Sequence, residues 1–167
     1  MAEEKKVFFG KVKHVGLFDF KELYEFLYKT LRDEDFIVFE EKYEEVNKGE
    51  SKDLQIKWSA KKTISTYFQF QIKIHYIILG LKKVKVKRGN EEISTDSGTL
   101  ELNFTTSLLK DPESEWDSSF MKSLHELYDH YVIHARVQEY EQELYERTNE
   151  FIAMIKSYLA IEGQHSW

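Results

Sequence analysis

The pattern of hydrophobic and polar positions changes its period along this chain. Over most of the first two thirds, hydrophobic residues alternate with polar ones, as in strands with one buried face. After Asp111-Pro112 they recur every three to four residues, which is typical of helices. The sequence therefore predicts a single domain, residues 1–167, with a strand-rich part over 1–110 and a helical part over 111–167.

One helix interrupts the strand pattern near the N-terminus. Asp19 can accept a hydrogen bond from a backbone N–H of the first turn, and Glu22 follows at the spacing of a capping box. The acidic cluster at 33–35 is unfavourable beside a helix C-terminus. A helix is therefore expected from Asp19 to about Arg32.

Period-2 alternation predicts about five to six strands. Their expected ranges are Val7–Val15, Phe36–Val46, Lys52–Lys62, Tyr67–Leu79, Leu81–Arg88 and Leu100–Leu108. Gly16 and Gly80 are expected to end strands, and Gly89-Asn90 to form a hairpin turn. The connections are too short for parallel crossovers, so the sheet should be an antiparallel meander.

The expected fold class is α+β, with this sheet packed against the N-terminal helix and the long C-terminal helical region. In the strongest strand pattern, Phe70 is expected on the buried face and Gln71 on the solvent-exposed face.

The C-terminal helical region carries two apolar stripes that do not share one register. The first ends at Tyr131 and the second begins at Val137. This predicts either a bend near residues 132–137 or two faces buried in different surroundings. Phe120 to Leu159 contains no Pro or Gly, and a straight helix over it would be about 60 Å long. Part of it is expected to fold back or to contact a partner chain.

The sign of the net charge also differs between the strand-rich and the helical parts of the chain. Residues 52–89 carry ten Lys/Arg and one acid, a net of +9, whereas residues 111–150 carry three Lys/Arg and eleven acids, a net of −8. The whole chain has a net charge of −6, which argues against a general nucleic-acid binder.

Composition also bounds the chemistry. The absence of cysteine excludes disulfides, thiolate nucleophiles and Cys-ligated metal sites. No secretory signal is visible, and no apolar run approaches the roughly 20 residues of a membrane helix. A soluble, cytoplasmic protein is expected.

No catalytic or cofactor motif stands out, so neither an enzyme nor a cofactor is expected. His130 and His134 have the i,i+4 spacing of a helical zinc site, but without a third ligand they are expected not to bind a metal. Glu41 shares a predicted strand face with Phe39 and Tyr43, where an inward carboxylate could serve a cavity as acid or base. The alternative is that this part of the strand is solvated.

A basic patch lies near the middle of the chain. It comprises Lys82, Lys83, Lys85, Lys87 and Arg88. A nucleic-acid site would require aromatic side chains on the same face. Few can be placed there, so the lysines are interpreted as protection of an exposed strand against aggregation, and a nucleic-acid partner is not expected.

The order of elements resembles that of the helix-grip fold, in which a curved sheet wraps a long terminal helix around a lipid or small-ligand cavity. The resemblance lies in element order alone and implies no family.

Two functional hypotheses follow. The first is a non-enzymatic interaction or structural module that self-associates as a homodimer, or binds a protein partner, through its C-terminal helices. Its interface candidates are Val137, Tyr140, Leu144, Phe151, Ile155 and Tyr158. The second is a binding protein for a small apolar ligand held between sheet and helix. Its cavity candidates are Trp58, Phe68, Phe70, Tyr76 and Glu41.

Overall fold

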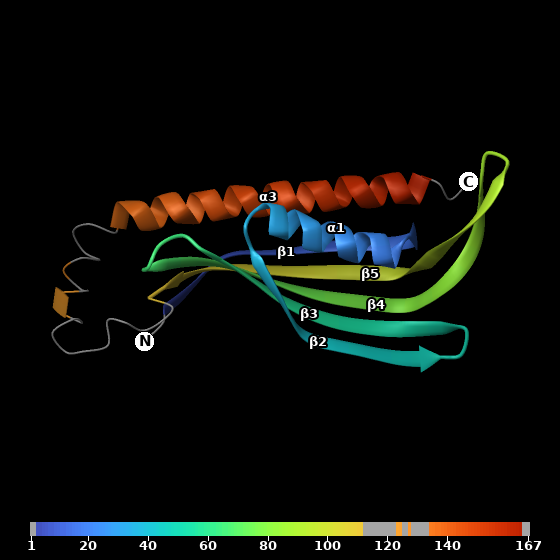
Figure 1. Cartoon of the computed structure of the whole chain (residues 1–167), viewed down its shortest axis with the longest axis horizontal. Coiled ribbons are helices and arrows are strands. Elements are labelled where there is room, and N and C mark those ends of the chain that lie inside the picture. The colour runs from blue at the N-terminus through green and yellow to red at the C-terminus, as the bar shows by residue number, and fades with distance from the viewer. Residues whose placement is uncertain (1–2, 112–122, 125–126, 128–133, 165–167) are drawn as a thin grey trace.

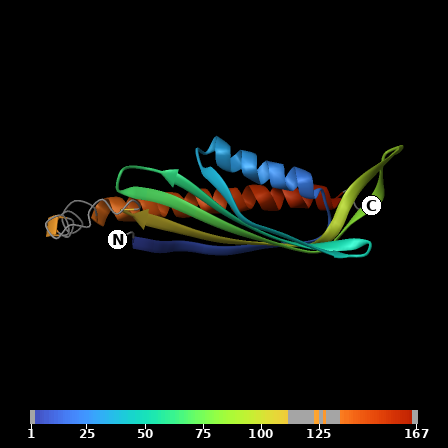
Figure 2. The same cartoon turned by 60° about the horizontal axis from the view of Figure 1, so that its bottom comes forward.

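In a computed structural model of the chain, a five-stranded antiparallel sheet carries helices on one of its faces (Figures 1 and 2). The structure describes residues 3–111, 123–124, 127 and 134–164. Its elements are β1 (Glu3–Phe18), α1 (Phe20–Asp33), β2 (Ile37–Lys48), β3 (Ser51–Thr63), β4 (Phe68–Arg88), β5 (Glu91–Lys110) and α3 (His134–Gln164). The predicted α+β class with an antiparallel meander is confirmed.

The strand order is β1-β5-β4-β3-β2. Strands β2 to β5 follow one another as hairpins. Strand β1 is added beside β5 and pairs with it along its whole length, from Glu3 opposite Lys110 to Phe18 opposite Asp96. The two edge strands are therefore β1 and β2. The N-terminal strand and the last strand lie side by side although their paired residues are 78 to 107 positions apart in sequence, from Phe18–Asp96 to Glu3–Lys110.

Two glycines were expected to end strands, and in both cases this prediction is wrong. Strand β1 continues through Gly16 to Phe18, and β4 continues through Gly80 to Arg88. Gly80 has φ of +63°, and the pairing of β4 with β5 shifts between Leu79 and Lys82. A positive φ in a strand produces a local bulge and bend while pairing resumes beyond it. The two expected strands are thus one bent strand.

Beyond this bend, β4 and β5 form an arm that projects from the end of the sheet (Figure 1). At its base the carboxylate of Asp96 accepts a hydrogen bond of 3.0 Å from the backbone N–H of Phe20, in the first turn of α1. The same carboxylate lies 2.9 Å from the Nζ of Lys83. A buried acid at a helix N-terminus is favoured by the helix dipole, so Asp96 ties the arm to α1.

Helix α1 forms as its sequence predicts. Asp19 is the N-cap, and its side chain accepts a hydrogen bond of 2.9 Å from the N–H of Glu22. The buried stripe of Leu23, Leu27 and Leu31 faces the sheet. The helix ends at Asp33, next to the acidic cluster.

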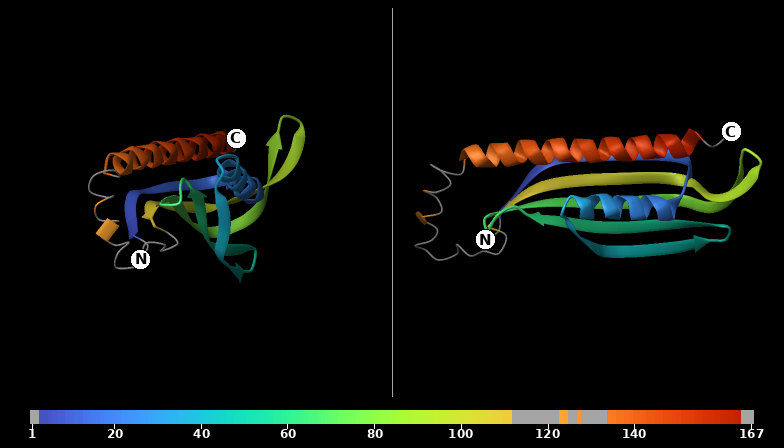
Figure 3. Two further views of the ribbon diagram at one scale, coloured as in Figure 1. Left: turned by 60° about the vertical axis from the view of Figure 1, so that its left-hand side comes forward. Right: turned by 45° about the horizontal axis from the view of Figure 1, so that its top comes forward.

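Helix α3 runs along the β1 and β5 side of the sheet, whereas α1 lies over its β3 and β4 side (Figure 3). A Cβ atom built on Gly10 of β1 would lie 3.2 Å from the Cδ1 of Ile152, so a glycine permits this close approach. The interface hypothesis assumes that the sheet can bury only part of the apolar stripe from Val137 to Leu159, and this assumption is wrong, because every residue of the stripe is buried or half-buried. Strand β1, along which α3 lies, has 16 residues, about 53 Å of strand, against about 46 Å for the 31 residues of α3.

The face of the sheet that contacts the helices, here called the inner face, holds the hydrophobic core. Phe70 of β4 is fully buried there, as expected. Gln71 points to the opposite, outer face but is only 8% exposed, which differs from the expectation of a solvated side chain. Its Nε2 donates to the Oγ of Ser59 at 3.3 Å, so a small buried polar contact lies within the outer face.

Candidate functional site

The four aromatic cavity candidates lie in the core of the inner face. Each of Trp58, Phe68, Phe70 and Tyr76 is at most 3% exposed. The rings of Trp58 and Tyr76 meet edge-on with centroids 5.0 Å apart, and Phe68 lies 5.0 Å from Tyr140 of α3. These rings pack against one another and against the helices, as in ordinary core packing.

Of the two readings of Glu41, an inward carboxylate or a solvated position, the structure shows the solvated one, because the strand contains a bulge there. The pairing of β2 with β3 shifts between Glu40 and Lys42, so Glu41 has no directly opposite partner and is exposed. The shift also separates Phe39, which lies on the outer face, from Tyr43, which lies opposite inner-face Ile56. Of these two neighbouring glutamates, Glu40 is the one on the inner face, opposite Trp58.

Glu40 is held by two aromatic donors. The hydroxyl of Tyr24 donates to its Oε2, and so does the Nε1 of Trp58 at 3.3 Å. Burial, then the hydrogen bond to Glu40 and its charge, raise the pKa of Tyr24 to about 12. Burial also raises the pKa of Tyr76 well above its usual value, and its hydroxyl has no hydrogen-bond partner within the described structure. Both phenols therefore stay protonated near neutral pH. The hydroxyl of Tyr24 and the Nε1 of Trp58 together hold the side chain of Glu40 in place.

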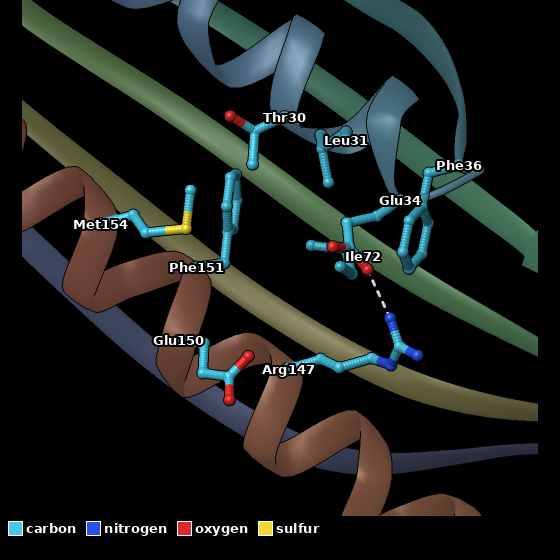
Figure 4. Close-up of a pocket in the computed structure, with 9 residues that line it drawn as sticks. All are labelled: Thr30, Leu31, Glu34, Phe36, Ile72, Arg147, Glu150, Phe151 and Met154. Carbon is cyan, nitrogen blue, oxygen red and sulfur yellow. Dashed lines mark hydrogen bonds and ion pairs between the residues drawn. The ribbon is translucent and has the colours of Figure 1, made fainter.

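A small recess lies where α1, α3 and the inner face meet (Figure 4). Its apolar wall is formed by Leu31, Phe36, Ile72, Phe151 and Met154. At its rim, Arg147 of α3 forms an ion pair with Glu34, just after α1. The recess has a volume of about 80 Å³. Sites for small organic ligands usually measure roughly 300–1,000 Å³, so this recess is small for an apolar ligand.

The interface candidates of the C-terminal helix contact the inner face of the same chain. Val137, Leu144, Phe151 and Ile155 are buried, and Tyr140 and Tyr158 are half-buried. The ring of Tyr158 stacks on Phe26 of α1 at 4.9 Å. The premise of the expected interface, an apolar stripe left exposed on the monomer, therefore does not hold. Self-association stays a prediction.

In the predicted homodimer, the acidic residues beside that stripe would form the rim of the interface and meet the lysines of the 82–88 patch. These acidic residues are Glu139, Glu141, Glu143 and Glu146. Within the chain, Glu141 instead pairs with Lys5 at 2.5 Å, and Glu143 pairs with Arg147 at 2.9 Å. Lys83 is bound to Asp96. Lys83 of the arm and Glu141 and Glu143 of α3 thus have ion-pair partners within the chain.

Of the two histidines at helical spacing, His130 lies outside the described residues. His134 is exposed at the start of α3. Among the residues that the structure describes, no group of three His, Asp or Glu side chains is placed to hold a metal ion.

The outer face of the sheet brings together residues that sequence reasoning did not connect. Directly opposite residues form two adjacent rows that cross all five strands. The first, here called the aromatic row, comprises Phe9, Thr105, Lys73, Ser59 and Phe39. The second, here called the cationic row, comprises Lys11, Asn103, His75, Lys57 and Lys42.

Positive charge dominates the surroundings of these rows although the chain as a whole is acidic. In and around the rows, seven lysines lie on the outer face, against four carboxylates. The lysines are Lys6, Lys11, Lys13, Lys42, Lys57, Lys61 and Lys73, and the carboxylates are Glu4, Glu44, Glu101 and the unpaired Glu41 at the bulge. Lys11 pairs with Glu101 at 3.3 Å, and Lys42 pairs with Glu44 at 2.6 Å. In the described part of the chain, Lys57 and Lys73 form no ion pair.

The centre of the cationic row is His75. Desolvation lowers its pKa, the neighbouring charges of Lys57 and Lys42 lower it further, and Glu101 opposes them. Its Nε2 is shielded from solvent and has no hydrogen-bond partner within the described residues. The charges of Lys57 and Lys42 thus disfavour a further positive charge on this imidazole.

The two rows border a shallow depression of about 500 Å³ in the outer face. The side chains along it include Phe9, Lys11, Lys57, Lys73 and Asn103, together with the acidic Glu41 and Glu101. Phe9, which lines the depression, is 70% exposed, and Phe39, outside it on the edge strand β2, is 53% exposed. Exposed aromatic rings on both edge strands, with cationic side chains between them, make this face the strongest candidate for a binding site.

Sequence reasoning missed this site because its residues come from five separate segments. The basic patch at 82–88 was visible since its lysines are contiguous, whereas Lys11, Lys42, Lys57 and Lys73 are far apart in sequence. The sequence offered only a weak indication of the site, namely that each of these lysines falls on the polar side of a strand pattern. Only the register of pairing places them in adjacent positions.

Comparison of the chain with protein-family models, with curated proteins and with solved structures finds no match. Among the described residues, no helix combines the length and apolar character required to cross a membrane.

Proposed function

We propose that this protein is a non-enzymatic binding module that uses the outer face of its sheet to bind a polyanionic partner. The observation that carries the proposal is the concentration of unpaired or weakly paired lysines around the 500 Å³ depression in a chain whose net charge is −6. Protein surfaces with one dominant sign of charge attract partners of the opposite sign and raise association rates.

The same charge disfavours self-association through this face. In a symmetric dimer the same patch of both subunits would meet, which would place lysines opposite lysines. The apolar stripe of α3 is buried within the chain, so the binding role is assigned to the sheet and not to the C-terminal helix.

A double charge reversal tests the proposal. Lys57→Glu together with Lys73→Glu places two carboxylates at the centre of the face. Fluorescence anisotropy would measure binding to three labelled probes: a single-stranded oligonucleotide, a heparin oligosaccharide and a polyglutamate peptide. We expect at least one probe to bind, and the double variant to weaken that binding about tenfold or more at low salt.

The matched control is Lys29→Glu together with Lys156→Glu. It changes the net charge equally, at exposed positions on α1 and α3, on the other side of the molecule. When the two variants are also compared at about 0.1 M salt, where the Debye length is about 10 Å, the affinity of this control should stay within about twofold of the unmodified protein, since charges on the far side of the molecule are then largely screened. Absence of binding to all three probes, or equal losses in the two double variants, would overturn the proposal.

A further inference from the structure

We infer that the polyanion bound by the outer face is single-stranded nucleic acid, whose bases stack on Phe9 and Phe39 while its phosphates contact the cationic row. This inference rests on the proposed function and adds the class of partner.

The aromatic row places a ring at each edge of the sheet and only polar or cationic side chains between them. Phe9 lies opposite Thr105, and Phe39 lies opposite Ser59. Four strand spacings separate the rings, about 19 Å. Neither ring is used by the core, since both point away from the helices and remain more than half exposed.

The cationic row lies immediately beside the aromatic row, one step of the same face along the strands. Lys11, Lys57 and Lys42 supply charge at both sides and at the centre, and Lys73 joins them from the aromatic row. A positively charged track next to aromatic platforms is the arrangement with which proteins bind single strands, because every base offers a π-face and every nucleotide a phosphate.

Hydrogen-bonding side chains fill the positions between these groups. Asn103 and Thr105 of β5 are half-buried in the middle of the depression. The amide of Asn103 already donates to Glu101 at 3.0 Å, which fixes its orientation. Its carbonyl oxygen and the hydroxyl of Thr105 are suited to contact base edges or ribose.

Other polyanions use these features less completely. A nucleic-acid duplex keeps its bases stacked inside, so exposed rings would gain nothing from it. An acidic polypeptide or a sulfated glycan would use the lysines but would offer no flat π-system to the rings. An anionic membrane would require the apolar side chains to insert together, whereas Lys73 lies between two rings about 19 Å apart.

The experiment removes the rings and leaves the charges. Phe9→Ala together with Phe39→Ala is compared with Val15→Ala together with Leu79→Ala, which removes exposed apolar side chains from the same outer face. Binding to 12-nucleotide single-stranded RNA (oligo-U) and DNA (oligo-T) would be measured by anisotropy at several salt concentrations. The additional probes are a duplex of equal length, polyglutamate, a heparin oligosaccharide and vesicles containing phosphatidylserine.

We expect the unmodified protein to bind one or both single strands more tightly than any other probe. The phenylalanine variant should bind them about tenfold or more weakly, the value expected when a stacking ring is truncated. The dependence of its affinity on salt should be unchanged, since every lysine is still present. Lys57→Glu together with Lys73→Glu should reduce the slope of log affinity against log salt by about 0.7 for each phosphate that is no longer neutralised. The Val15 and Leu79 variant should bind like the unmodified protein.

The outcomes separate the two proposals. If the phenylalanine variant binds single strands as well as the unmodified protein does, stacking is refuted while the polyanion site remains. Tighter binding of the duplex, polyglutamate, heparin or the vesicles would likewise overturn the inference and retain the proposed function. Failure of every probe to bind would overturn both. A preference for RNA over DNA would add a contact to the 2′-hydroxyl.

Discussion

The two faces of the sheet are built from alternate residues of the same strands, yet one is a buried apolar surface and the other is a largely exposed polar surface. On the inner face, Trp58 and Phe70 are at most 1% exposed and pack under two helices. One position along each strand, Lys57 and Gln71 point the other way. The composition of the inner face is determined by the need to bury apolar area, whereas most of the outer face is not constrained in this way.

Phenylalanine appears on both faces, which makes the difference instructive. Phe70 removes its ring from water, and Phe9 keeps 70% of its side chain exposed. The same residue type therefore contributes several kcal/mol to folding on one face and almost nothing on the other. Because the exposed ring of Phe9 contributes little to stability, a role in binding is the simplest explanation for its presence.

The largest expected effect is a loss of stability when a phenylalanine of the inner face is truncated. Truncating Phe70 to alanine should lower the free energy of unfolding by about 3–5 kcal/mol, because less apolar area is buried and the packed inner face cannot close the cavity. Phe39→Ala, on the outer face, should change it by less than about 0.5 kcal/mol. Urea denaturation followed by circular dichroism measures both. Losses of similar size would show that both faces are buried.

An intermediate effect is expected at Gln71, the outer-face residue that is buried. The sequence pattern predicts a cost well under 1 kcal/mol for Gln71→Ala, but the structure shows a hydrogen bond of 3.3 Å to Ser59 and only 8% exposure. Removing this bond should lower the free energy of unfolding by about 1 kcal/mol. Gln55→Ala, at an exposed position of the same face, is the control and should be nearly neutral. Equal values for both would mean that the hydrogen bond of Gln71 contributes nothing.

A smaller effect concerns the pH dependence of binding. The pKa of His75 is lowered by desolvation and by Lys57 and Lys42, with Glu101 opposing and Lys11 bound to Glu101. The imidazole is therefore neutral in the free protein near pH 7, and a bound polyanion would raise its pKa. Binding then takes up a proton, so affinity should increase as the pH falls through the region below the ordinary histidine value of about 6.5.

We expect an increase of about threefold between pH 7.5 and 5.5 in the affinity for a single-stranded oligonucleotide, measured by anisotropy. His75→Gln should abolish it and leave the affinity at pH 7.5 nearly unchanged. An identical pH profile in the variant would assign the proton to another group.

The smallest effect is expected where the helices meet solvent. Arg147 pairs with Glu34 and Glu143 at the rim of the recess, and all three side chains are more than a third exposed. Exposed ion pairs contribute little, so Arg147→Ala should cost less than about 0.5 kcal/mol in urea denaturation. Leu31→Ala, in the buried wall of the same recess, should cost about 2–5 kcal/mol. A decrease of more than about 1 kcal/mol at Arg147 would indicate that the rim holds the two helices together.

Local chemistry made much of the fold predictable. The cap of Asp19 and the end of α1 beside the acidic cluster followed from first-turn and last-turn chemistry. The alternation in β3 and β4 identified Trp58 and Phe70 as buried residues, because one face of each strand must leave water. The turn at Gly89-Asn90 followed from the conformational freedom of glycine, whose φ is +62°.

Errors arose where one residue changes the direction of a strand. Gly80 was read as a strand end, but pairing with β5 continues beyond it, so tertiary hydrogen bonds outweigh the local break. The bulge at Glu41 reversed the expected faces of Glu40 and Glu41, because an extra residue shifts the period of 2 by one. Neither shift can be read from hydrophobicity alone.

The sequence by itself determined which residues of each strand leave water and where α1 begins and ends, since these depend on side-chain polarity and on neighbours within one turn. Only the tertiary structure decided that α3 finds a sheet long enough to bury its stripe. It also decided that Phe9, Lys73, Lys57 and Phe39 share one surface. Their adjacency depends on the register of β1-β5-β4-β3-β2, which is fixed by hydrogen bonds between segments far apart in the chain.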